Sequence, residues 1–264
     1  MSLELFLDTA NVDEVCHLKQ WGIIDGLTTN QKIFLREKGV NFQQRVRELL
    51  CLVDGPVSIE VTSSDPEGFL AEAREYATWG KNVVIKVPML ANGSGLKTIT
   101  ALEKEGIKTN ATIMMSASQV FLAAKAGACY ASLFYRRIMD CGEDADRTVA
   151  TARDLLDKLG FETKLVLGSI RAPDDVLRAA VAGAHVVTVP SNILQQMAYH
   201  HRTEETAKEF DLAWQEFKSG ERPRRGDGSG AFEQMLTRRD WSLGAQETET
   251  DAPRLPRTSP PGSP

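Results

Sequence analysis

Short apolar runs rich in β-branched residues recur along the first 218 residues and alternate with stretches whose apolar positions repeat at helical spacing. Apolar runs of this length, bounded by breakers or polar residues, are typical of buried parallel strands. The pattern predicts eight strands, over Leu3–Asp8, Gly26–Thr29 (preceded by Ile23 and Ile24), Val57–Thr62, Val83–Val87, Thr109–Met114, Tyr130–Phe134, Lys164–Ser169 and Val186–Val189.

Helical patterns fill the gaps between these runs. They predict helices over Val12–Trp21, Phe42–Val53, Pro66–Trp79, Gly95–Glu105, Ala117–Ala126, Glu143–Leu159 and Pro173–Ala182, with a last amphipathic helix over Glu204–Phe217. Prolines at first helical positions and glycines after the last helical positions support these boundaries. Eight strands that alternate with helices predict an α/β fold, a (β/α)₈ TIM barrel with an extra C-terminal helix. A doubly wound open sheet is the alternative, but no GxGxxG follows the first strand.

The composition changes near residue 218. Residues 219–264 hold six of the eleven prolines and six of the twenty glycines of the chain. This bias predicts a flexible linker over Ser219–Gly230 and a disordered proline-rich end over Asp251–Pro264, with a short helix within Ala231–Leu243 as an alternative for the middle. We therefore expect a barrel domain over residues 1–218 and a flexible, mostly disordered tail over residues 219–264.

Charge and cysteine usage exclude several classes of protein. A net charge of −5 gives no indication of nucleic-acid binding, and no apolar stretch is long enough to predict a membrane span. The first residues carry an acid early and no basic region, so they do not resemble a secretory signal. The cysteines lack zinc-site spacing and, like the neighbouring His200 and His201, form no metal-ligand pattern; we expect a reducing cytoplasm and no metal or organic cofactor. These cysteines are Cys16, Cys51, Cys129 and Cys141.

Polar residues gather at the carboxyl ends of the predicted strands, where a barrel builds its active site. Most conspicuous is Lys86, which lies in an otherwise apolar strand although lysine is rarely buried without a partner. The other candidates at strand ends are Asp8, Thr29, Asn30, Glu60, Asn110, Thr112, Ser132, Arg137, Ser169 and Arg171. Each has an ordinary structural explanation: Asp8 as a helix cap, Glu60 as an ion-pair partner of Lys86, the arginines as surface charge. A convergent buried set of polar groups is costly, however, and usually functional.

The residue types indicate a chemistry. A neutral amine attacks a ketone to form an imine, and desolvation favours the neutral amine. The protonated imine of Lys86 would accept electrons when a carbon–carbon bond breaks, while Asp8 or Glu60 moves the hydroxyl proton. Arg137 and Arg171, with Ser169, are suited to an anion because guanidinium groups donate to phosphate in a fork.

These residues, in this order, resemble the transaldolase family, closest to its short-chain members, which include the fructose-6-phosphate aldolases. The resemblance covers Leu5 to about Phe217. Its motifs are Leu7–Asn11, Gly26–Asn30, Val57–Val61, Val84–Pro88, Thr109–Thr112 and Gly168–Arg171. Several strand-end motifs in register make a specific signal, which a single motif would not.

The resemblance implies a class I aldol mechanism on sugar phosphates, as in the pentose phosphate pathway, with Lys86 as the Schiff-base lysine. It implies that Asp8 handles the donor hydroxyl proton and that Glu60 and Thr112 hold the catalytic water. Asn30, Asn110 and Ser132 match positions that contact the dihydroxyacetone unit, with Thr29 and Phe134 beside them. Arg137, Ser169 and Arg171 match the phosphate site, and a homo-oligomer, commonly a pentamer or decamer, is implied.

Two positions favour a transferase over an aldolase. The aldolase-like members carry glutamine where this chain has Glu60, and tyrosine where it has Phe134. A phenol near the Schiff base can protonate the enamine and release free dihydroxyacetone, whereas phenylalanine leaves the enamine waiting for an aldehyde acceptor. An aldolase-like lyase is the alternative, and an inactive barrel scaffold is the remote one.

The chain departs from the family pattern at Gln31, which replaces a proline and should loosen the loop that aims Asn30. It departs again at Leu133, which replaces a proline, and at Tyr135 and Arg136, where a small pair is common. Bulk and charge at these last two positions, next to the expected phosphate arginine, leave the acceptor open. A specialised biosynthetic acceptor is one expectation.

Overall fold

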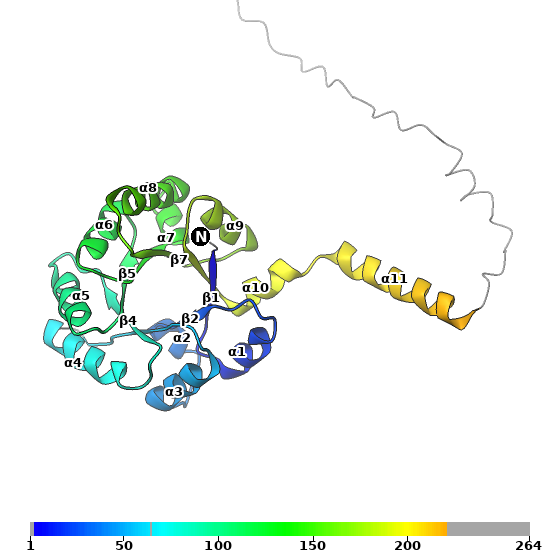
Figure 1. The fold of residues 1–264 in the computed structure, drawn as a ribbon, viewed down its shortest axis with the longest axis horizontal. Helices are drawn as coiled ribbons and strands as arrows, with labels where there is room; N and C mark the ends of the chain where they lie inside the picture. The colour runs from blue at the N-terminus through cyan, green and yellow to red at the C-terminus, as the bar shows by residue number, and fades with distance from the viewer. Residues whose placement is uncertain (1–2, 64, 221–264) are drawn as a thin grey trace, which may run out of the picture. The chain divides into compact units, whose positions relative to one another are not determined.

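Eight parallel strands close into a barrel in the computed structural model, which describes residues 3–63 and 65–220 (Figure 1). Each strand pairs with the next along the chain, and β1 pairs with β8. The strands are β1 (Glu4–Asp8), β2 (Gly26–Thr28), β3 (Val57–Glu60), β4 (Val83–Pro88), β5 (Thr109–Met114), β6 (Tyr130–Phe134), β7 (Lys164–Gly168) and β8 (Val186–Val189). The closure confirms the predicted (β/α)₈ barrel and excludes the open sheet.

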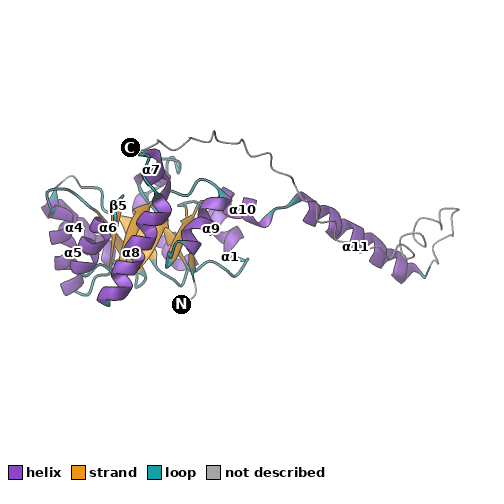
Figure 2. Ribbon diagram, turned by 90° about the horizontal axis from the view of Figure 1, so that it is seen from above, coloured by secondary structure: helices purple, strands orange, loops and turns teal. Residues whose placement is uncertain are grey.

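Helices surround the strands on the outside of the barrel (Figure 2). The long ones are α1 (Val12–Lys19), α3 (Phe42–Leu52), α4 (Pro66–Ala77), α5 (Ser94–Lys104), α6 (Ala117–Lys125), α8 (Ala145–Leu159) and α9 (Pro173–Val181). All seven match the predicted helices within a few residues at each end. Three further helices follow strand ends and were not predicted: α2 (Gln31–Phe34), α7 (Tyr135–Asp140) and α10 (Ser191–Ala198). The first two are too short to show a helical period in the sequence.

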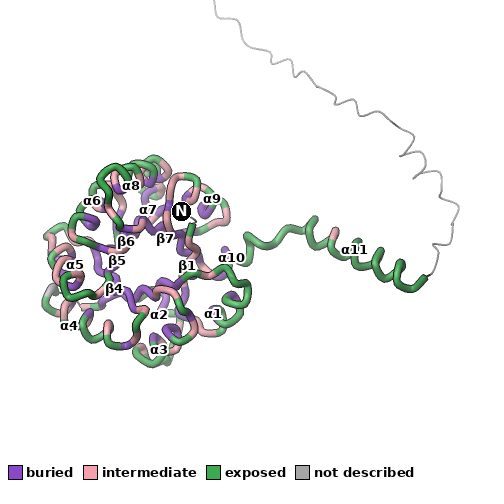
Figure 3. Tube along the Cα trace, in the orientation of Figure 1, coloured by how far each residue is buried: buried purple, intermediate pink, exposed green. Residues whose placement is uncertain are grey.

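Side-chain caps explain where several helices begin. Asn11, Asn41, Asp65 and Asp144 each accept a hydrogen bond from a backbone N–H in the first turn of the helix that follows. Such a bond satisfies one of the donors that a helix start leaves unpaired. The strands between these helices are buried on both faces, which accounts for their near-continuous Val, Ile and Leu content (Figure 3).

Strand register brings three polar residues of the predicted site to one level. Glu60 on β3 pairs with Lys86 on β4, and Lys86 pairs with Asn110 on β5. Further along β5 the register with β6 shifts between Ala111 and Met114, and Ile113 takes a positive φ of 60°. A bulge of this kind re-aims side chains at the rim of a barrel.

The chain divides into two units, one up to Thr203 and one from Glu204. The last described helix, α11 (His201–Ser219), extends the predicted helix at both ends. Apart from Ser219 and Gly220, the tail predicted for residues 219–264 lies outside the described residues. Its disorder, the helix within Ala231–Leu243 and the domain boundary at residue 218 remain predictions.

Candidate active site

A cavity of about 380 Å³ lies at the carboxyl ends of the strands. Its volume is in the range of small-molecule sites. Eight residues proposed from the sequence line it together: Asp8, Asn30, Glu60, Lys86, Ser132, Phe134, Arg137 and Ser169. The parallel strands therefore bring most of the dispersed candidates into one site.

Lys86 lies at the centre of this set and is only 5% exposed. Its Nζ donates a hydrogen bond of 3.0 Å to the backbone carbonyl of Thr29 and lies 3.8 Å from Oε2 of Glu60. The structural explanation of Glu60 as an ion-pair partner is therefore correct as far as it goes. A separation of 3.8 Å is longer than a hydrogen bond, so the amine and the carboxylate form an ion pair without a direct hydrogen bond.

Asp8 stands at the end of β1 and is partly buried. Its Oδ1 accepts a hydrogen bond of 2.7 Å from the hydroxyl of Thr28, which also lies 2.5 Å from the hydroxyl of Thr188. Burial raises the pKa of Asp8, while the Lys86 cation, the Thr28 hydrogen bond and the Arg36 cation offset part of that rise. The cap of the following helix is Asn11, so the alternative role of Asp8 as a helix cap is excluded.

Glu60, at the end of β3, is a second buried carboxyl group. Burial raises its pKa, and the nearby Lys86 cation and a hydrogen bond from Gln31 oppose the rise. Gln31 also donates a 3.1 Å hydrogen bond from Nε2 to the carbonyl of Val61. The side chain of Gln31 thus ties the start of α2 to the end of β3, and the expectation that Gln31 loosens its loop stays a prediction. Asn30 accepts from the N–H of Ile33 and caps α2.

Four predicted residues do not line the cavity, and three of them lie buried within the barrel. Asn110 accepts a 2.7 Å hydrogen bond from Ser132 and donates to Ser58, so both ends of its amide are used. The hydroxyl of Thr29 donates to the carbonyl of Ser58. Thr112 is fully buried, and its Oγ1 has no hydrogen-bond partner among the described residues. An unpaired buried hydroxyl is costly and suits a site for ordered water.

The fourth absent residue is Arg171. Its guanidinium makes two hydrogen bonds to the carboxylate of Asp140, and about half of its side chain is exposed. The prediction that Arg171 joins the anion site is not met in this structure, because Asp140 holds it outside the cavity. Arg137 does line the cavity, with its guanidinium carbon 4.8 Å from the ring centroid of Phe134. Ser169, directly after β7, also lines the cavity and takes a positive φ of 61°.

Tyr135 and Arg136, the unusual pair after β6, also point away from the cavity. Tyr135 is fully buried and donates its hydroxyl to Asp146, while Arg136 donates from Nε to Oδ2 of Asp175 at 2.8 Å. Neither residue lines the cavity, so their bulk and charge do not enter its described wall. They secure α7 against the helices that follow it in the chain. Leu133 is likewise fully buried.

Sequence reasoning missed two cations of the cavity wall, Lys32 and Arg36. Both come from α2 and the turn after it, a segment that no hydrophobic period identified. Spacing of four residues places two side chains on the same side of a helical turn, and this was the available signal. Thr28, Ile113 and Thr188 also line the cavity.

The raised pKa of Asp8 has a consequence for stability. The folded protein holds the Asp8 proton more tightly than the unfolded chain does, so ionisation costs stability as pH rises above about 4. We expect Asp8→Asn to raise the free energy of unfolding at pH 7, by a margin that shrinks toward pH 4. Urea denaturation at several pH values measures this, and an Asp8→Asn variant less stable than the wild type at pH 7 contradicts it.

Asp175 provides the opposite case and serves as the matched control. Burial acts to raise its pKa, but hydrogen bonds from Arg136 and from the N–H groups of Arg171 and Ala172 outweigh burial and lower it. Its carboxylate contributes stability that is present above about pH 4 and is lost as pH falls through the lowered folded value. Asp175→Asn is therefore expected to destabilise the protein at pH 7, by about 2–3 kcal/mol.

Among residues 3–63 and 65–220, no group of three or more His, Cys, Asp and Glu side chains is placed to hold a metal ion. In the same part of the chain, no helix combines the length and apolar character that crossing a membrane requires.

Comparison with known proteins gives a consistent result. Residues 5–223 match the family model described as transaldolase/fructose-6-phosphate aldolase. A probable transaldolase from Desulforudis audaxviator is 46% identical over 216 residues, which is 82% of this chain and 99% of that protein. Probable transaldolases from Petrotoga mobilis and Lactiplantibacillus plantarum are 43% and 40% identical, covering 82% of this chain and 96% and 99% of their own lengths.

Proposed function

Because the chain belongs to the transaldolase/fructose-6-phosphate aldolase family, we propose that it is a transaldolase working through a Schiff base on Lys86. It would transfer a dihydroxyacetone unit from a ketose phosphate, such as fructose 6-phosphate or sedoheptulose 7-phosphate, to an aldose or aldose phosphate acceptor. The observation that carries this proposal is a buried lysine amine in a cavity with two carboxyl groups whose pKa values burial raises. Carboxyl groups of this kind suit proton transfer near neutral pH.

Each proton has a candidate carrier. The Lys86 amine attacks the ketone carbon of the donor and water leaves, so the donor becomes an iminium. Asp8 takes the proton of the hydroxyl beyond the scissile bond, the carbon–carbon bond breaks, and its electron pair moves into the iminium to form an enamine. Glu60 and Thr112 are proposed to hold the water of imine formation and hydrolysis. The unpaired buried hydroxyl of Thr112 supports this role, although Thr112 does not line the cavity itself.

The remaining roles concern binding. Asn30 and Ser132 line the cavity and would contact the dihydroxyacetone unit, while Asn110 would position Ser132 through their 2.7 Å hydrogen bond. Thr29 would hold the Lys86 amine through its carbonyl. Arg137 and Ser169 would bind the phosphate, and Arg171 would join them only after releasing Asp140.

The hypothesis that the protein is a transferase makes a direct kinetic prediction. With fructose 6-phosphate alone, we expect one equivalent of glyceraldehyde 3-phosphate per active site and then no further release, because the enamine lacks a proton donor. Adding erythrose 4-phosphate is expected to restore continuous release. Continuous release without any acceptor would instead identify an aldolase-like lyase, and the absence of even one equivalent would favour an inactive scaffold.

Phe134 provides the variant that tests this reason. Phe134→Tyr places a phenol at the cavity wall and is expected to raise acceptor-independent release about tenfold or more, since a positioned general acid contributes at least that much. Phe161→Tyr is the matched control, because Phe161 packs against Phe121 and does not line the cavity. Equal acceptor dependence in the wild type and Phe134→Tyr would show that Phe134 is not the reason for the acceptor dependence.

We also propose a homo-oligomer, a pentamer or decamer by family resemblance, in the cytoplasm. Helix α11 is exposed along most of its length (Figure 3). Its side chains Phe210, Leu212, Trp214 and Phe217 are each more than half exposed, and apolar groups of this size usually have a partner. The four cysteines are free, which is typical of a reducing compartment.

A further inference from the structure

The cavity has an excess of positive charge in a chain that is acidic overall. Its described lining includes four basic side chains, Lys32, Arg36, Lys86 and Arg137, against the two carboxyl groups of Asp8 and Glu60. The whole chain has a net charge of −5. A cavity with the opposite sign from its protein concentrates anions locally.

Three of these cations make no ion pair within 4 Å among the described residues: Lys32, Arg36 and Arg137. By contrast, the arginines just outside the cavity are paired. Arg136 contacts Asp175 and Arg171 contacts Asp140. The cations that make no ion pair therefore lie at the cavity that a substrate would enter. The proposed phosphate site explains only one of them, Arg137.

Lys32 and Arg36 come from the opposite side of the barrel to Arg137. They follow β2, whereas Arg137 follows β6, and in a closed ring of eight strands these two positions are diametrically opposite. The fold therefore supplies cations to the cavity from two separate sides. Arg36 is also close enough to Asp8 for its charge to lower the pKa of that carboxyl group, so this side adjoins the proposed proton carrier.

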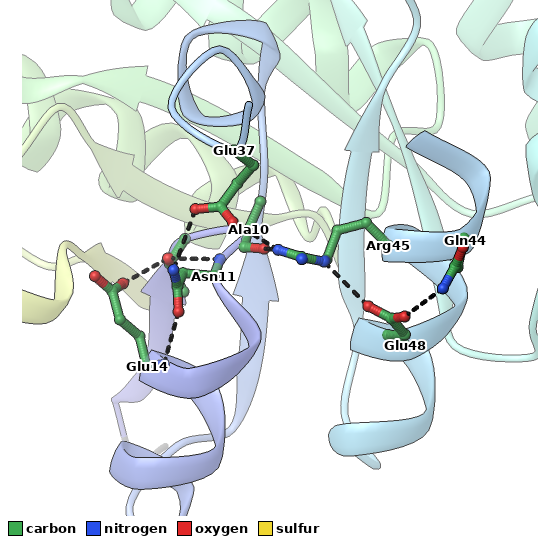
Figure 4. Close-up of polar contacts among 8 residues, drawn as sticks. Ala10, Asn11, Glu14, Glu37, Gln44, Arg45 and Glu48 are labelled. Atoms are coloured by element: carbon green, nitrogen blue, oxygen red, sulfur yellow. Dashed lines mark hydrogen bonds and ion pairs between the residues drawn. The ribbon is translucent and has the colours of Figure 1, made fainter. Parts of the chain in front are cut away.

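A partly buried ionic network holds the segment that carries these cations (Figure 4). Arg45 donates from Nη1 to Oε2 of Glu37 at 2.6 Å and to the carbonyl of Ala10 at 2.9 Å, and from Nε to Glu48. Asn11 donates to the other oxygen of Glu37 at 3.3 Å. Glu37 directly follows Arg36, so the network fixes this turn against the end of β1 and α3. Cations on an anchored turn are better placed for recognition than cations on a free loop.

We propose that Lys32 and Arg36 form a second anion subsite, which binds a second acidic group of the donor on the side of the barrel opposite Arg137 and Ser169. The preferred donor is then a ketose phosphate with acidic groups at both ends, a carboxylate or a second phosphate in addition to the first, because its ketone lies inside the carbon chain. The inference rests on the proposed function, because it assigns the donor of that same site.

Unreactive ligands test the subsite apart from catalysis. Erythritol 4-phosphate has one anionic group, erythronate 4-phosphate adds a carboxylate, and erythritol 1,4-bisphosphate adds a phosphate; none has an aldehyde or ketone that could form an imine. Calorimetric titration of the full-length protein at fixed ionic strength is expected to give at least one of the two ligands with a second anionic group a Kd about tenfold lower than that of erythritol 4-phosphate. Which of these two ligands binds more tightly identifies the second group.

Variants locate the effect. The double variant Lys32→Gln/Arg36→Gln is expected to remove the preference for ligands with two anionic groups, while Arg36→Lys should keep most of it. Lys38→Gln is the matched control, because Lys38 is exposed on the same segment but does not line the cavity. Arg137→Gln should weaken all three ligands alike. Thermal unfolding checks that each variant is folded.

Equal Kd values for all three ligands in the wild type would overturn the inference. A preference for ligands with two anionic groups that survives in the double variant would overturn it as well. Failure of the proposed function has a different signature. The ligand preference would then persist while donors release no glyceraldehyde 3-phosphate, with or without an acceptor.

Discussion

Replacing Lys86 by alanine is expected to lower kcat by about 10⁴-fold or more, because Lys86 supplies the buried amine beside the carboxyl groups, whereas the other lysine of the described lining, Lys32, is exposed. The loss should appear in every step that passes through the imine, so neither the single equivalent of glyceraldehyde 3-phosphate nor its acceptor-dependent release should remain. A coupled assay for glyceraldehyde 3-phosphate, with and without erythrose 4-phosphate, measures both.

A matched lysine controls for the loss of a charge from this strand region. Lys81 is exposed just before β4 begins, at the opposite end from Lys86, and Lys81→Ala should keep wild-type rates. Removing Lys86 also removes the cation beside Glu60, so unfolding must be measured for each variant. A folded Lys86→Ala variant that retains a hundredth of the wild-type activity would contradict the mechanism.

Replacing Asp8 by asparagine is expected to lower kcat by about 10²–10⁴-fold, the usual contribution of a positioned acid or base. Asparagine keeps the shape of the side chain and the oxygen that accepts from Thr28, so the change removes mainly proton transfer. Imine formation should survive, because Lys86 and Glu60 are unchanged. The variant is therefore expected to form the donor imine yet cleave it slowly.

The control for Asp8 is Asp25, which accepts a hydrogen bond from the N–H of Leu5 at the other end of β1. Asp25→Asn should leave kcat unchanged within about twofold, even if it alters stability. If Asp8→Asn cleaves the donor at the wild-type rate, another group carries the proton, and Glu60 becomes the candidate.

The barrel was predictable because its strands are buried on both faces and so consist of continuous apolar runs. The runs around Lys86 and Asn110 ended within a residue of the observed strands. The short helices α2, α7 and α10 were not predictable in this way. Each is a turn or two long, and the contacts that hold it, such as the hydrogen bond from Gln31 to the carbonyl of Val61, join residues far apart in the chain.

The candidate site was predictable wherever a residue stands at a strand end, since parallel strands bring those ends together. Asp8, Glu60 and Lys86 are of this kind. Arg171 was not, because its position depends on Asp140, 31 residues away in the chain. The directions of Tyr135 and Arg136 likewise depend on the distant partners Asp146 and Asp175. Side-chain pairing between helices leaves no local pattern in the sequence.

The most direct test of the account is to trap the imine. Sodium borohydride reduces an imine to a stable amine, so treating the protein with fructose 6-phosphate and borohydride should add a reduced unit derived from the donor to one peptide. Mass spectrometry of the digest is expected to place that unit on Lys86, with no addition when the donor is omitted. A folded protein that gains no mass on the Lys86 peptide, or gains it on another lysine, would contradict the central claim.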